Sequence, residues 1–175
     1  MQRPAITIGG ALVVVGCLLS GQVLARQSGG LKADLVRDWN AQKARLVAVA
    51  EAMPADKYEF KPTPAQRTFG EQLHHLAQAN VTMFKRLDPA GKVPAPEVPS
   101  GHDRDTVVQF VGASYDYAAK VLESLSDSDL TAPTGPNNAT PARTVWAAMS
   151  NAANHYGQCV VYLRLNGIVP PASRR

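Results

Sequence analysis

Apolar residues recur at helical spacing in four long stretches of the chain. The first runs from Leu31 to Met53 and is closed by Pro54, and the others begin near residues 68, 103 and 140. In each stretch the apolar positions lie three or four residues apart with polar residues between them, as in an amphipathic helix. No alternating period-two run of useful length occurs, so the sequence predicts an all-α protein.

Capping signals indicate where these helices begin. Thr68 and Glu71 form a capping-box pattern, in which each side chain satisfies a free backbone N–H at the helix start. Asp103 or Asp105 can cap the third helix. Thr140 can cap the last, which we expect to run to residues 166–167, where Asn-Gly is a C-terminal stop.

The segments between the helices carry prolines and glycines and show no periodicity, notably residues 89–99 and 126–138. Four amphipathic helices joined by such loops favour a four-helix bundle. Because these loops are longer than an up-down-up-down bundle requires, we expect at least one crossover connection.

The first 25 residues resemble a secretory leader, with Arg3, an apolar stretch over residues 11–19 and a small residue at Ala25. We expect cleavage after Ala25 and one helical domain over residues 26–175, exported to the periplasm or the extracellular space. A lipoprotein, with a lipid anchor at Cys17, is the alternative. The apolar stretch is short and broken by glycines, which argues against a membrane span.

Charge and cysteine content narrow the function classes. Arg3 is the only charged side chain of the leader, so cleavage lowers the formal net charge from +4 to +3. The basic residues are scattered rather than gathered in a stripe with aromatics, which argues against nucleic acid as a partner. Only Cys159 would remain after cleavage at Ala25, so no intramolecular disulfide is expected.

Histidines are the candidate metal ligands. His74 and His75 are adjacent, so their side chains diverge by about 100° around the helix and only one is expected to face the interior. Spacing does not decide which. His155 lies in the last helix, with Asn151 one turn before it and Cys159 one turn after it on the same face. Imidazole binds zinc, nickel and ferrous iron, but firm binding needs three or four ligands.

Two strings, "NHYGQCVVYLRLNGIVPP" and "MPADKYEFKPTPAQRTFGEQLHHLA", resemble the DinB/YfiT-like four-helix bundle proteins. The resemblance covers about residues 31–173. It implies a divalent metal held by three histidines, one on the second helix and two spaced i, i+4 on the last.

Carried over by position, this resemblance assigns ligand roles to His75 and His155, with His75 rather than His74 facing the last helix. The middle ligand falls on Asn151, whose amide oxygen is a weaker donor than imidazole for a borderline metal. Cys159 either joins the site or behaves as a small hydrophobic residue. The metal implied is zinc, nickel or iron.

Three functions remain open. The first is a metal-binding or small-molecule-binding module. The second is a metal-dependent thiol transferase or a related hydrolytic enzyme, as the resemblance implies. The third is a structural bundle with a vestigial site. A homodimer is compatible with each of these functions. Trp146 and Tyr162 are expected to be core aromatics rather than a substrate platform.

Overall fold

The computed structural model describes residues 29–174. The expected leader, Cys17 and the expected mature start at Arg26 lie outside these described residues. Within this range the chain is helical and has no strand. The helices are α1 (Leu31–Ala52), α2 (Phe69–Lys85), α3 (Arg104–Ser124), the short α4 (Asp127–Thr131) and α5 (Pro141–Leu165), and the 3-10 turns are η1 (Ala55–Lys57), η2 (Pro136–Asn138) and η3 (Pro171–Ser173).

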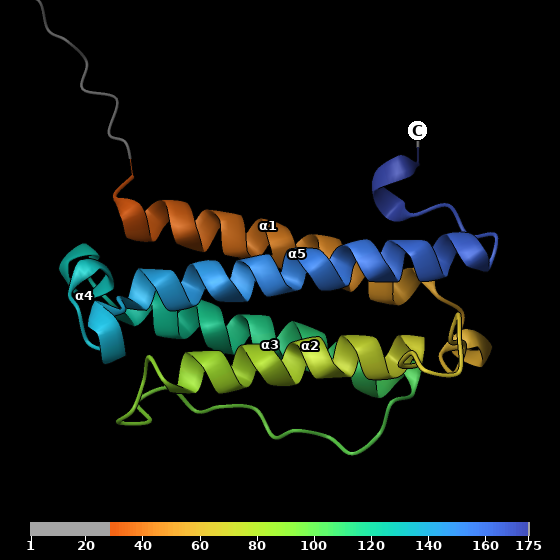
Figure 1. The fold of residues 1–175 in the computed structure, drawn as a ribbon, viewed down its shortest axis with the longest axis horizontal. Coiled ribbons are helices and arrows are strands. Elements are labelled where there is room, and N and C mark those ends of the chain that lie inside the picture. The colour runs from red at the N-terminus through yellow and green to blue at the C-terminus, as the bar shows by residue number, and fades with distance from the viewer. Residues whose placement is uncertain (1–28, 175) are drawn as a thin grey trace, which may run out of the picture.

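The four long helices form a bundle in which α1 and α2 are diagonal to one another. Each of these two helices packs against both α3 and α5. Figure 1 shows that α2 and α3 run in the same direction, which the chain achieves by returning along the length of the bundle through residues 86–103. The predicted four-helix bundle and its crossover connection are therefore confirmed.

Side-chain caps start the helices as the sequence predicted. Thr68 and Glu71 form the capping box of α2, Asp103 caps α3, and Thr140 caps α5. The short α4 was not predicted. Its own capping box begins at Ser126, but five residues are too few to show a helical period.

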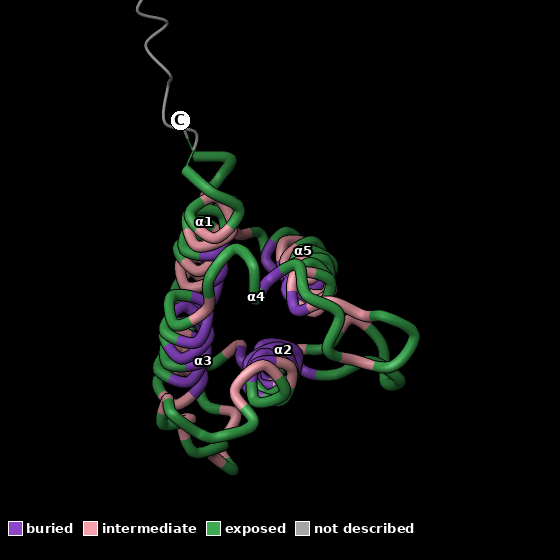
Figure 2. The backbone as a smooth tube through the Cα atoms, turned by 90° about the vertical axis from the view of Figure 1, so that its left-hand side faces the viewer, coloured by how far each residue is buried: buried purple, intermediate pink, exposed green. Residues whose placement is uncertain are grey.

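An aromatic cluster lies in the core where α1, α2 and α3 meet. The Trp39 ring centroid lies 4.8 Å from that of Phe84 and 4.6 Å from that of Tyr115. The Trp39 indole N–H donates to the Tyr115 carbonyl at 3.0 Å, so its polar atom is satisfied inside the core. Figure 2 shows the buried positions of the helices turned toward the bundle interior.

The two aromatic predictions for the last helix have opposite outcomes. Tyr162 is buried, as predicted, whereas Trp146 is 63% exposed, so its prediction as a core aromatic is wrong. Trp146 follows Val145, which is fully buried. One residue along a helix turns the side chain by about 100°, which carries Trp146 out of the inward face.

Among the described residues, no helix combines the length and the apolar character needed to cross a membrane.

Candidate metal site between α2 and α5

His75 on α2 and His155 on α5 lie together where these two helices pack. Their ring centroids are 5.4 Å apart and the rings are inclined by 59°. His155 is 5% exposed, and His75 is partly buried. As predicted, His75 lies on the side of α2 that faces α5. The assignment of both residues as metal ligands stays a prediction.

The pKa values of both imidazoles are lowered from the ordinary value of histidine, which favours the neutral form. Burial lowers the pKa of His155, and His75 and Arg67 lower it further. Burial also lowers the pKa of His75, again with a contribution from Arg67. The neutral form of imidazole binds a metal, because one of its ring nitrogens has a free lone pair.

One ring nitrogen of the two histidines lacks a hydrogen-bond partner. His155 Nδ1 is buried and has no hydrogen-bond partner among the described residues. Buried polar atoms are nearly always satisfied in native proteins, so an exception points to a water, an ion or a functional role.

Polar contacts on the same seam fix α2 against α5. The Gln72 side chain donates to Gln158 Oε1 across the two helices, and Gln158 Nε2 donates to Asn154 Oδ1 at 3.2 Å. The Tyr162 hydroxyl donates to the Arg67 carbonyl at 2.8 Å. Gln72 was not singled out from the sequence, although it lies three residues before His75, as Gln158 lies three after His155. These contacts hold the two histidines in register.

The structure does not bring Cys159 into this pair. Cys159 is fully buried, and burial raises the pKa of its thiol to about 12. Within residues 29–174, no group of three or more His, Cys, Asp or Glu side chains is placed to hold a metal ion. Asn151 lies one turn before His155 on α5 and is partly exposed. The available donor set is therefore two imidazoles and, from the same helical face, one neutral amide.

This donor set fits a borderline divalent metal. Neutral nitrogen ligands suit zinc, nickel and iron, and positions not filled by protein remain for water or an added ligand. His75 and His155 would hold the metal, with Asn151 as a weaker third donor.

His74 has a different environment from its neighbour. It is 8% exposed, and its Nε2 lies 2.7 Å from the Pro99 carbonyl oxygen. Its ring meets His102 edge to face, with centroids 4.7 Å apart. A methyl group on Gly70 would overlap the His102 carbonyl, so glycine lets the connection lie close over α2.

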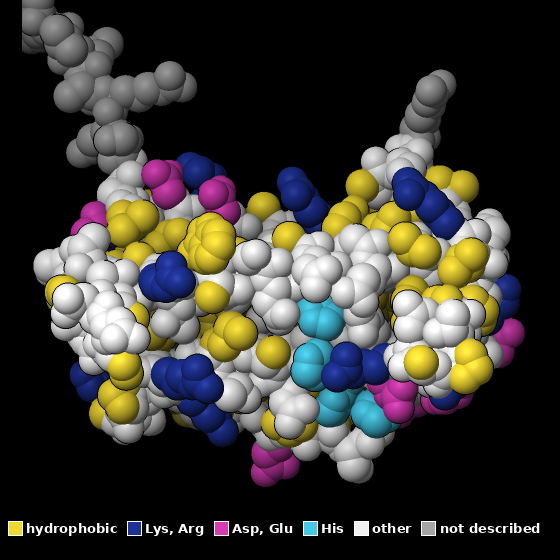
Figure 3. All heavy atoms as spheres, in the orientation of Figure 1, with side chains coloured by type: hydrophobic (Ala, Val, Ile, Leu, Met, Phe, Trp, Pro, Cys, Tyr) yellow, Lys and Arg dark blue, Asp and Glu magenta, His cyan; other side chains and the backbone are white. Residues whose placement is uncertain are grey.

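His74 and His75 are therefore both at least partly buried, but on different sides of α2. The connection over residues 86–103 covers the side of α2 that carries His74. Figure 3 shows the histidine side chains gathered on one face, beside a cationic side chain.

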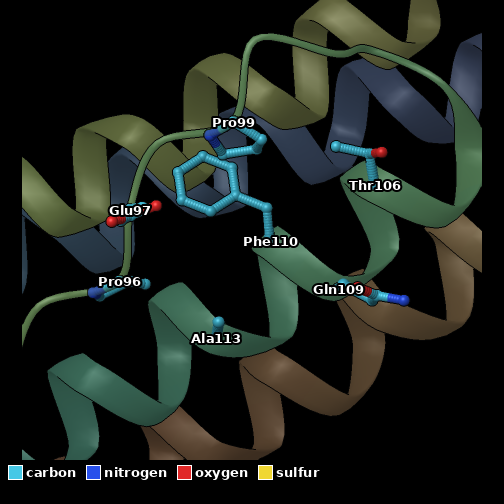
Figure 4. Close-up of a pocket in the computed structure, with 7 residues that line it drawn as sticks. All are labelled: Pro96, Glu97, Pro99, Thr106, Gln109, Phe110 and Ala113. Carbon is cyan, nitrogen blue, oxygen red and sulfur yellow. The ribbon is translucent and has the colours of Figure 1, made fainter.

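Two pockets flank these histidines. One of about 220 Å³ is lined by α2 residues from His75 to Met83 and by Arg86, which directly follows the helix. The other, of about 230 Å³, lies between the connection and α3. Figure 4 shows this second pocket, where Phe110 and Pro99 supply apolar surface and Glu97 is the only charged residue of its lining. Because it contains no imidazole or thiol, it is a poor candidate for a transition-metal site.

Comparisons with known proteins agree with this fold. Residues 38–159 match the DinB superfamily. The crystal structure of a DinB-like protein from Bacillus subtilis matches with a TM-score of 0.66 and 18% sequence identity, covering 81% of this chain and 99% of that one. No curated protein matches the chain.

Proposed function

The chain belongs to the DinB superfamily, and we propose that it is an exported protein that binds a divalent metal or a small ligand at the His75–His155 pair. The observation that carries this proposal is the buried Nδ1 of His155, which has no hydrogen-bond partner among the described residues, beside the imidazole of His75. A purely structural histidine at this depth would be expected to have a hydrogen-bond partner, as His74 has.

The protein's contribution would be to position donors. Gln72 and Gln158 cross-link α2 and α5 one turn from the pair, so the two imidazoles are held on rigid elements rather than on loops. With only Asn151 as a further candidate donor, binding would be weaker than at a three-histidine site. A metal held here would supply Lewis acidity to a bound small molecule.

A metal-dependent thiol transferase, or a related hydrolytic enzyme, is the second candidate. It is favoured by the pocket of about 220 Å³ that begins at His75, because this pocket offers room for a substrate beside the pair. Cys159 would not be the attacking thiol, since its raised pKa keeps it protonated and it is fully buried.

Metal content of the purified chain tests this proposal. We expect zinc, nickel or iron in the parent protein and its loss in His155→Ala, because removing one of two imidazoles leaves too few donors. His102→Ala is the matched control, since His102 contacts His74 rather than the pair. A parent chain without bound metal would instead indicate a structural bundle with a vestigial site. Equal metal in all three proteins would show that the metal is bound elsewhere, and would contradict the assignment to the His75–His155 pair.

The proposed export has its own test in the mass of the protein recovered after expression with its leader. A chain beginning near Arg26 agrees with cleavage of a secretory leader. A diacylated Cys17 at the N-terminus would instead show a lipoprotein.

A further inference from the structure

The pocket beside His75 is a groove along one face of α2. Its lining residues recur at intervals of three and four, and they are His75, Gln78, Ala79, Thr82, Met83 and Arg86. From the first to the last of these residues the helix rises by about 16 Å. The middle of the groove has apolar surface from Ala79 and Met83. The Thr82 hydroxyl beside them donates to the Gln78 carbonyl at 2.9 Å.

A cation lies at the far end of this groove. Arg86 is exposed and forms no ion pair with the residues that the structure describes. A further pocket of about 260 Å³ continues beyond Arg86 and includes Asp129. The Oδ2 atom of Asp129 accepts hydrogen bonds from the backbone N–H and the hydroxyl of Ser126, and no ion pair joins Asp129 to Arg86 within the described residues.

The histidine end of the groove also has a cation. Arg67 directly precedes the cap of α2, and its carbonyl accepts the Tyr162 hydroxyl of α5. Its charge acts on the pair, since it contributes to lowering the pKa of both His75 and His155. Arg67 likewise forms no ion pair within residues 29–174. In Figure 3, hydrophobic side chains lie between the histidines and a second group of cations on the same face.

We propose that this groove binds a linear dianion with an apolar spacer, such as a medium-chain dicarboxylate. One anionic group lies at the His75–His155 pair near Arg67, and the other pairs with Arg86. The spacer covers Ala79 and Met83. This inference names the ligand class of the proposed small-ligand site and rests on that proposed function.

Charge and polarity both select this ligand class. Unpaired cations at the two ends raise the local concentration of anions, and a guanidinium binds a carboxylate with two parallel hydrogen bonds. A monoanion of the same length would form only one of these contacts. An uncharged chain would form neither.

Calorimetric titration with octanedioate and with octanoate, in buffer freed of metal on a chelating resin, tests the proposal. We expect octanedioate to bind about threefold more tightly than octanoate, the gain of one exposed ion pair. Arg86→Gln should remove this preference. Lys85→Gln is the matched control, because it removes the same charge one residue away and outside the groove lining, and it should keep the preference.

Three results would overturn the proposal: no binding of octanedioate, equal affinity for the two probes, or equal losses in Arg86→Gln and Lys85→Gln. The metal content of Arg86→Gln separates this inference from the proposed function, since Arg86 is not a metal ligand. If Arg86→Gln keeps its metal but loses the preference for octanedioate, both the metal-binding proposal and the dianion proposal are supported. Absence of metal from the parent chain would contradict metal binding. It would leave the octanedioate test intact, because that titration is carried out in metal-free buffer.

Discussion

His74 and His75 are neighbours in the sequence but belong to two different regions of the molecule. The His74 region lies under the connection, where its imidazole contacts the Pro99 carbonyl and the His102 ring. The His75 region lies between α2 and α5, where His155 Nδ1 has no partner among the described residues. His74 is 8% exposed and His155 is 5% exposed, so burial does not distinguish the two regions. They differ in hydrogen bonding, because His74 has a partner and His155 Nδ1 has none among the described residues. This difference identifies the His75 region as the candidate site.

The comparison predicts opposite stability effects in the metal-free protein. His74→Leu should lower the free energy of unfolding by about 1–3 kcal/mol, because the Pro99 carbonyl loses its donor. His155→Leu should be close to neutral or stabilising, because it replaces an unsatisfied polar ring with an apolar side chain. Urea unfolding of both variants measures the difference. A larger loss in His155→Leu would contradict the distinction between the two regions.

Adding a third imidazole should strengthen zinc binding in the His75 region. Asn151→His places two histidines at i, i+4 on α5, opposite His75 on α2. We expect the zinc affinity to rise by about tenfold, limited by the partners that a new imidazole needs for its orientation. Titration under identical buffer and pH provides the measurement.

Cys159→Ser in both backgrounds is the control for this titration. Because Cys159 is fully buried and burial raises the pKa of its thiol to about 12, its substitution should leave the zinc affinity unchanged. An Asn151→His chain that binds no more tightly than its parent would show that the site geometry is wrong. Loss of parent binding in Cys159→Ser would show that the thiol is a ligand.

A smaller effect is expected from pH. The pKa values of His75 and His155 are lowered in the folded state, so below about pH 6.5 the unfolded chain binds more protons than the folded one. Their contribution to stability is therefore complete above that pH and is lost as the pH falls through the lowered folded pKa values. Unfolding free energies measured between about pH 7.5 and pH 5.5 should fall less steeply in His155→Leu than in the parent. Equal slopes would contradict the assigned shifts.

The regular parts of the fold could be predicted from local patterns. The caps at Thr68, Asp103 and Thr140 and the apolar periods determine the long helices, because these interactions act within a few residues. The burial of His74 could not be predicted in this way. It depends on residues 86–103, an irregular segment that returns along the bundle and carries no period.

The candidate site was predicted in part. Helical spacing places Asn151 and His155 on one face, but spacing could not choose between His74 and His75, and the family resemblance supplied that choice. The contact between Gln72 and Gln158 joins residues 86 positions apart. Such a pairing depends on which helices are neighbours, which sequence periodicity does not specify. The exposed Trp146 shows the same limit, since one residue of helical rotation decides whether an aromatic faces the core.

Zinc titration of the parent chain beside His75→Ala and His74→Ala tests the central claim most directly, because the two variants remove the same side chain from adjacent positions. The account predicts that His75→Ala lowers the zinc affinity at least tenfold, the loss of one imidazole ligand, whereas His74→Ala, which shares no partner with the pair, leaves it within about twofold. Equal losses in the two variants, or a larger loss in His74→Ala, would contradict the assignment of the metal site to the His75–His155 pair.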